Sequence, residues 1–158
     1  MPTPREQIDA YLAGPDTLRR AVAGMTPDQV RARPVAGKWS TLEVVCHLAD
    51  FDAILADRMK RIIALERPSL LAADENRFTA TLACHERDLE EELRLIAATR
   101  AQMARILRTL PPADFARQGV HSEKGPRTLQ DILAAAVNHI PHHVAFIAAK
   151  RLALGLPT

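Results

Sequence analysis

Hydrophobic residues recur at steps of three and four over four long stretches of the chain, and the residues between them are mostly polar. This spacing predicts amphipathic α-helices that bury one face. The longest regular repeat runs through Leu89, Leu93, Ile96, Met103 and Leu107. The predicted helices are residues 5–23, 41–66, 82–110 and 129–149.

Polar residues that favour helix starts precede two of these stretches. Ser40 stands three residues before Glu43, and Thr128 stands three residues before Asp131. Both pairs resemble a capping box, in which side chains satisfy the free amides of a first turn. Thr26 also indicates the start of a short helical turn, with proline at the next position.

Two prolines lie inside the predicted helices. Pro15 falls in the first and Pro141 in the last. Proline removes one backbone hydrogen bond, so we expect each to bend its helix rather than end it.

The connections at residues 67–81 and 111–127 lack a helical repeat and contain proline or glycine. We expect both to be surface segments, the first compatible with a helical turn near Asp74. The chain has no useful run of alternating apolar and polar residues, and it has only four Phe, one Tyr and one Trp. The pattern therefore predicts an all-α four-helix bundle in a single domain covering residues 1–158.

Composition narrows the expected partners. The net charge of +2 comes from 21 basic and 19 acidic residues spread along the chain, which argues against nucleic acid or an anionic membrane. We find no basic, apolar leader and no stretch near the ~20 apolar residues that cross a bilayer, so we expect a cytoplasmic protein. Cys46 and Cys84 are too few for a disulfide framework.

The clearest candidate chemistry is a histidine pair in the last helix. His139 and His143 are four residues apart, so both side chains project from one face, one turn apart. Such a pair can share a divalent metal or can be two hydrogen-bonded core histidines. A third ligand would come from a facing helix, and His47 is the strongest candidate because it borders an apolar stripe. We expect the other two candidates, His85 and His121, to be exposed to solvent.

The motif Gly37-Lys38-Trp39-Ser40, with Glu43 and His47-Leu48-Ala49-Asp50 after it and the late pair His139 and His143, resembles the DinB/YfiT-like family. The resemblance implies a four-helix bundle, often a homodimer, that binds one divalent metal through three histidines. Position by position, these histidines correspond to His47, His139 and His143. Members of the family with assigned activities are hydrolase-like enzymes or thiol-dependent transferases and isomerases.

Three neutral histidines leave coordination positions open, as in catalytic metal sites. We expect zinc or nickel first, and iron or manganese next, acting as a Lewis acid that activates water or holds a thiolate. Asp50, one turn after His47, is the candidate proton acceptor, and its alternative is a solvated carboxylate. The first hypothesis is a metal-dependent hydrolase or thiol transferase acting on a small molecule. The alternative is a non-enzymatic metal-binding or stress-response dimer.

Two further residues interrupt the apolar pattern. Arg100 occupies a seam position of the third helix, and we expect its charged end to reach the surface; the alternatives are an anionic substrate or a buried carboxylate such as Glu43. Trp39 precedes the second helix and is expected to pack over its first turns.

Overall fold

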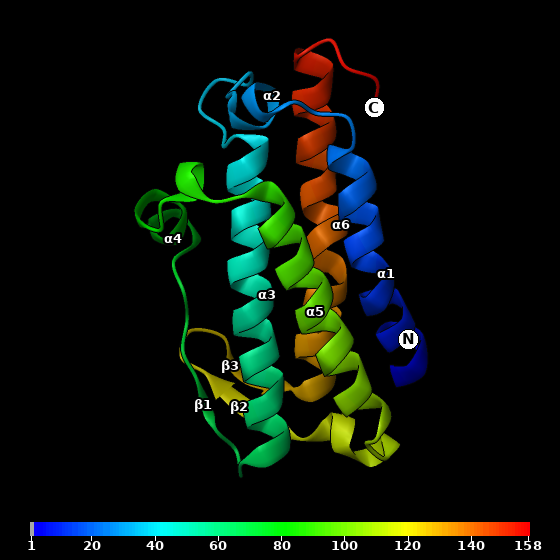
Figure 1. The fold of residues 1–158 in the computed structure, drawn as a ribbon. Coiled ribbons are helices and arrows are strands. Elements are labelled where there is room, and N and C mark those ends of the chain that lie inside the picture. The colour runs from blue at the N-terminus through cyan, green and yellow to red at the C-terminus, as the bar shows by residue number, and fades with distance from the viewer. Residues whose placement is uncertain (1) are drawn as a thin grey trace.

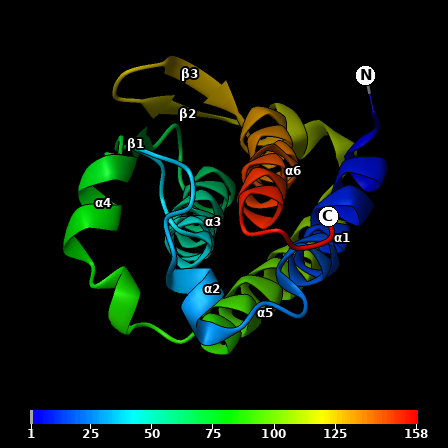
Figure 2. The same cartoon turned by 90° about the horizontal axis from the view of Figure 1, so that it is seen from above.

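Four long helices form a bundle in the computed structural model, which describes residues 2–158 (Figure 1). They are α1 (Pro4–Val22), α3 (Thr41–Ala64), α5 (Leu89–Arg108) and α6 (Leu129–Ala153). Each of α1 and α3 packs against both α5 and α6. Helices α1 and α6 run in one direction and α3 and α5 in the other, so α1 and α3 lie diagonally across the bundle (Figure 2). The four-helix bundle predicted from the sequence is confirmed.

The predicted helix starts are also confirmed. The hydroxyls of Ser40 and Thr128 accept hydrogen bonds from the amides of Glu43 and Asp131, and both acidic side chains accept a bond from the amide of the capping residue. Thr26 caps the short helix α2 (Pro27–Arg31) in the same way. Helices α1 and α6 continue through their internal prolines.

The predicted start of the third long helix at residue 82 is wrong. Residues before α5 form the short helix α4 (Glu75–Thr81) and the single turn η1 (Cys84–Glu86). Ala83 adopts a left-handed backbone with φ of 48°, which ends one helix before the next begins. Asp88 then caps α5, so the exposed Leu82 does not belong to the packed seam.

The connections contain strands that the sequence did not predict. Strands β1 (Ser69–Leu70), β2 (Gln118–His121) and β3 (Gly125–Thr128) form one small sheet, with β1 parallel and β3 antiparallel to the central β2. The turn η2 (Pro112–Ala116) precedes β2. Strands of two to four residues are too short to show a period of two, which is why the sequence pattern missed them.

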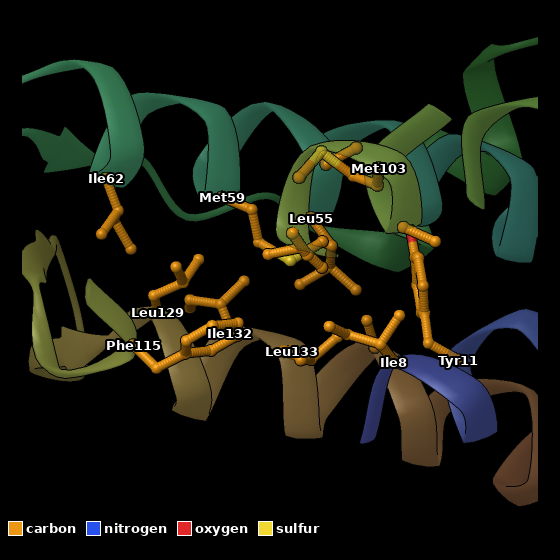
Figure 3. Close-up of a cluster of buried hydrophobic side chains, with 14 of the residues drawn as sticks. Ile8, Tyr11, Leu55, Met59, Ile62, Met103, Phe115, Leu129, Ile132 and Leu133 are labelled. Atoms are coloured by element: carbon orange, nitrogen blue, oxygen red, sulfur yellow. The ribbon is translucent and has the colours of Figure 1, made fainter. Parts of the chain in front are cut away.

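The core has two main apolar clusters along the bundle. One lies near the sheet and includes Leu55, Met59, Met103, Leu129 and Leu133 (Figure 3). The other lies toward the opposite end and draws on α1, α3, α5 and α6.

A buried ion pair joins these clusters. Arg100 is fully buried, and its Nε and Nη2 donate to the two carboxylate oxygens of Asp52 at 2.6 and 2.8 Å. Its Nη1 and Nη2 also donate to the carbonyls of Tyr11 and Ala136, each at 3.0 Å. The expectation that Arg100 reaches the surface is therefore wrong, and its buried partner is Asp52 rather than Glu43. These four acceptors offset part of the cost of removing the guanidinium charge from water.

Helix α6 is long and apolar enough, by length and composition alone, to cross a membrane. The expectation that no segment reaches this threshold is thus wrong for α6. In the bundle, however, Leu133, Ala136, Ile140 and Ile147 of α6 are fully buried against the other helices. Burial in the core accounts for part of its composition, since 28% of the apolar window of α6 is buried.

Candidate metal centre

Three histidines from two facing helices meet at one point. His47 lies in the second turn of α3, and His139 and His143 lie one turn apart near the middle of α6. The Nε2 atom of His47 is 3.0 Å from that of His139 and 3.1 Å from that of His143. One nitrogen from each ring lies within 4.8 Å of the others. The structure brings together the three side chains that the sequence singled out.

These separations fit a shared divalent ion. Imidazole nitrogens bind divalent ions at about 2.0–2.1 Å, so Nε2 atoms 3.0–3.1 Å apart could contact the same ion. Three protein ligands would leave further coordination positions of such an ion to water or substrate.

The protonation state of the rings also suits a ligand role. Burial lowers the pKa of His47 and His143 to about 4 and that of His139 to about 3, because an imidazolium is poorly solvated in an apolar setting. The repulsion between the rings lowers the pKa of His139 and His143 further. All three are therefore neutral near pH 7, with lone pairs available for a cation.

The second nitrogen of each ring has no polar neighbour. The Nδ1 atoms of His47, His139 and His143 are buried and lack a hydrogen-bond partner within residues 2–158. Aromatic rings surround them instead: Trp39 and Phe51 lie 5.1 and 4.6 Å from the ring of His47. Trp39 also packs against the apolar cluster that contains Val44, as expected from its place before α3. Most metal-binding histidines have a hydrogen-bonded second nitrogen, whereas these three rings are held by packing.

The remaining histidines lie outside the cluster. His142 is exposed and packs beside Phe146, and His85 is a partly exposed neighbour of Glu43. The expectation that His121 is solvated is wrong: it lies in β2, is 6% exposed, and accepts bonds at Nδ1 from the amides of Glu123 and Lys124. The strand that buries it was the element that the sequence pattern missed.

Asp50 has an arginine as its close partner. Its two carboxylate oxygens accept bonds from Arg87 at 3.0 and 2.9 Å, and Arg87 also binds Glu92. Asp50 makes no hydrogen bond to the three histidines in the described part of the chain. Its role as a proton acceptor stays a prediction.

Two cavities flank the histidine cluster. A cavity of about 630 Å³ is lined by His139 and His143 together with Lys38, Trp39, Phe146 and Lys150, among others. A second, of about 500 Å³, reaches from His139 to the buried His121 and Arg58. Glu75 of α4 lines both. Volumes of this size are typical of sites for small molecules.

Lys150 and Glu75 are among the lining residues that the sequence analysis did not single out. Lys150 is seven residues after His143, and this spacing places it on the same face of α6, so its position could have been found. Glu75 reaches the site through the path of the connection after α3, which carries no periodic signal.

Comparison with known proteins identifies the family to which this arrangement belongs. The family model of the DinB superfamily matches residues 10–147. The chain belongs to the DinB superfamily. YfiT from Bacillus subtilis, a DinB relative provisionally named a metal-dependent hydrolase, is 30% identical over 156 residues, covering 96% of this chain and 88% of its own. A relative from Geobacillus thermodenitrificans with the same provisional name is 29% identical over 148 residues, covering 93% and 83%.

A solved structure of a relative has the same fold. The structure of YfiT from Bacillus subtilis matches this chain with a TM-score of 0.90 at 28% identity, and it is described as having an unusual four-helix bundle topology. The match covers 98% of this chain and 89% of that one. The DinB/YfiT-like resemblance noted in the sequence is confirmed.

Proposed function

We propose that this DinB protein is a metal-dependent enzyme, a hydrolase in the first place, acting on a small molecule at the His47, His139 and His143 cluster. The observation that carries the proposal is the convergence of three neutral Nε2 atoms within about one metal coordination sphere. The provisional names of the relatives agree with it.

The protein's own residues would perform three tasks. The three imidazoles hold the ion on one side, the aromatic rings of Trp39 and Phe51 exclude water from the ligand shell, and the larger cavity admits a substrate to the open side. A bound divalent ion supplies Lewis acidity there.

The larger cavity favours an enzyme over a simple metal-binding or stress-response protein. A site that only stores or senses an ion needs no space beyond its ligands. Here polar side chains that are not ligands, including Glu75, Asn76 and Lys150, line a volume of about 630 Å³ next to two of the histidines. These groups are available to orient a substrate.

The metal can be identified directly. Protein produced without a histidine tag should contain about one equivalent of zinc or nickel by elemental analysis, with iron and manganese as the next candidates. The loaded protein should then be assayed on a panel of esters, amides and thiol acceptors. Turnover of esters or amides that disappears with the metal supports a hydrolase; turnover only with a low-molecular-weight thiol supports the thiol transferase. Retention of metal without turnover on any substrate favours the non-enzymatic alternative.

We further propose Asp50 as the group that takes up a proton at its carboxylate during turnover. Its bonds to Arg87 would have to open for this. Asp50→Asn should keep metal affinity and lose turnover. Glu92→Gln is the matched control, because it weakens the bond between Arg87 and its other carboxylate partner. If Glu92→Gln gave the same result as Asp50→Asn, the ion pair between Asp50 and Arg87 would be purely structural.

Assembly and location are part of the same proposal. We expect a cytoplasmic homodimer that binds neither nucleic acid nor membrane, in keeping with the dispersed charge of the chain. The exposed apolar residues Phe146 and Leu152 of α6 are suited to a contact between copies. Light scattering that returns the monomer mass of 17.4 kDa at all concentrations would contradict the dimer.

A further inference from the structure

Lys150 is a buried lysine without an acidic partner. Only 3% of the residue is exposed, although lysine is almost never buried unless it is paired. Its Nζ donates to the carbonyl of Phe146, one turn back on α6, at 3.2 Å. Among residues 2–158, no carboxylate oxygen lies within 4.0 Å of its ammonium group.

The carboxylate that favours the charged form of Lys150 is that of Glu43, which already has other partners. Glu43 accepts bonds from Arg33 and from the amide of Ser40, and it lies 3.3 Å from His85. A second cation, Lys38, acts on Lys150 in the opposite sense to Glu43, and burial is the largest influence lowering the pKa of Lys150. The ammonium group is therefore short of both water and counter-charge.

Lys150 and Lys38 both line the cavity that contains His139 and His143. The carbonyl that anchors Lys150 belongs to the third residue after His143, a rise of about 4.5 Å along the helix. The bond from Lys150 therefore lies on the C-terminal side of His143 along α6. Phe146, Trp39 and Val44 provide apolar wall in the same cavity.

We propose that this cavity binds a substrate with an anionic group, a carboxylate or phosphate, which pairs with Lys150 while the reacting group faces the histidine cluster. This inference rests on the proposed function and names its class of substrate. Lys38, at the exposed rim, adds to the attraction. The substrate carries an apolar or uncharged segment between its two ends, next to the apolar wall of the cavity. Lys150 is a positioning and specificity residue, because it holds a part of the substrate that does not react.

A pair of thiols tests this inference without knowledge of the substrate. The probes are 4-mercaptobutyrate and 4-mercapto-1-butanol, which share a sulfur for the metal and differ in the charge at the far end. Each is titrated into the full-length nickel-loaded protein, and binding is followed by the thiolate-to-metal absorption band and by calorimetry. The wild type should bind the carboxylate at least about tenfold tighter than the alcohol, as expected for a charge-assisted bond in a buried setting.

Variants separate Lys150 from other causes of such a preference. Lys150→Met should reduce the carboxylate preference to less than about twofold while leaving the affinities for nickel and for the alcohol unchanged; Lys150→Arg should keep most of it. The matched control is Lys124→Met, which removes a lysine from the neighbouring cavity and should preserve the wild-type preference.

The outcomes distinguish the two proposals. A wild type that holds nickel but binds both thiols equally, or binds neither, overturns the anionic-substrate inference and leaves the metal site standing. A carboxylate preference that survives Lys150→Met also overturns it, since the carboxylate would then be bound by the metal itself. A wild type that does not bind nickel, zinc, iron or manganese overturns the proposed function and this inference with it.

Discussion

Arg100 and Asp52 form a two-point ion pair at the centre of the bundle, where their side chains are 0% and 1% exposed. The same guanidinium also donates to backbone carbonyls of α1 and α6, so one side chain from α5 contacts all three of the other long helices. Every one of these bonds is charge-assisted and shielded from water, which makes the pair sensitive to loss of either member.

Replacing Asp52 by alanine should lower the free energy of unfolding by about 3–5 kcal/mol, because it leaves a buried guanidinium without its counter-charge. Urea denaturation followed by circular dichroism measures the loss. The double variant Asp52→Leu, Arg100→Met is the control, and it should recover most of the stability because it removes both charges. Additive losses in the double variant would show that the two side chains do not act as a pair.

Gly14→Ala should destabilise the protein even though alanine favours helices by about 1 kcal/mol over glycine. A β-carbon at Gly14 would clash with Nη1 of Arg100, so the guanidinium would have to shift and weaken its bond to the carbonyl of Tyr11. We expect a net loss of about 1–3 kcal/mol. In an Arg100→Met background the same change should cost much less, and thermal melting of the four proteins decides the matter.

His143→Ala should weaken metal binding by at least about 10–100-fold, since it removes one of three proposed ligands. His142→Ala is the matched control and should bind metal normally, because a step of one residue rotates the side chain about 100° away from the cluster. Calorimetric titration with zinc or nickel compares the two. Normal binding by His143→Ala would contradict the proposed ligand set.

The metal-free protein should lose stability as the pH falls from 6.5 toward 4. The pKa of a histidine in the unfolded chain is about 6.5, whereas the folded values are about 4 for His47 and His143. Below pH 6.5 the unfolded chain therefore binds more protons, and each histidine lowers the free energy of unfolding by up to about 1.4 kcal/mol per pH unit. Above pH 6.5 this contribution is constant.

A single variant isolates this effect from other acid-sensitive groups. His47→Leu should show a shallower fall in melting temperature between pH 6.5 and 4 than the wild type, with both proteins free of metal. Parallel curves would mean that the three buried histidines do not control the acid response.

Removal of metal should lower the melting temperature without unfolding the chain. The apolar clusters of four long helices form a core that does not include the site's nitrogens. At a free metal concentration one hundred times the dissociation constant, the ion adds about 2.7 kcal/mol, or roughly 5–10 °C in melting temperature. Addition of a chelator should remove this increment and keep the helical circular dichroism signal. A disordered chain after chelation would reassign the site as structural.

The sequence predicted most of the fold because long helices leave a repeated signal. The capping boxes at Ser40 and Thr128 and the apolar seams sufficed for α3 and α6. The strands and the late start of α5 were missed for a different reason. Pairing between strands as short as two residues depends on tertiary contacts. The break before α5 depends on the backbone angles of a single residue, the left-handed Ala83.

The site was predictable to the same extent. His139 and His143 are related by helical geometry, and His47 follows from the start of its helix. The buried state of His121, Arg100 and Lys150 was not, because burial depends on what packs from other elements. For Arg100, the deciding neighbour Asp52 lies 48 residues away, and no local pattern links the two.

The three histidines are widely separated in sequence, since His139 and His143 follow His47 by 92 and 96 positions. During synthesis, α1, α3 and α5 all leave the ribosome before the second half of the cluster exists. An ion that bound this cluster would therefore meet a chain whose other three long helices had already been made.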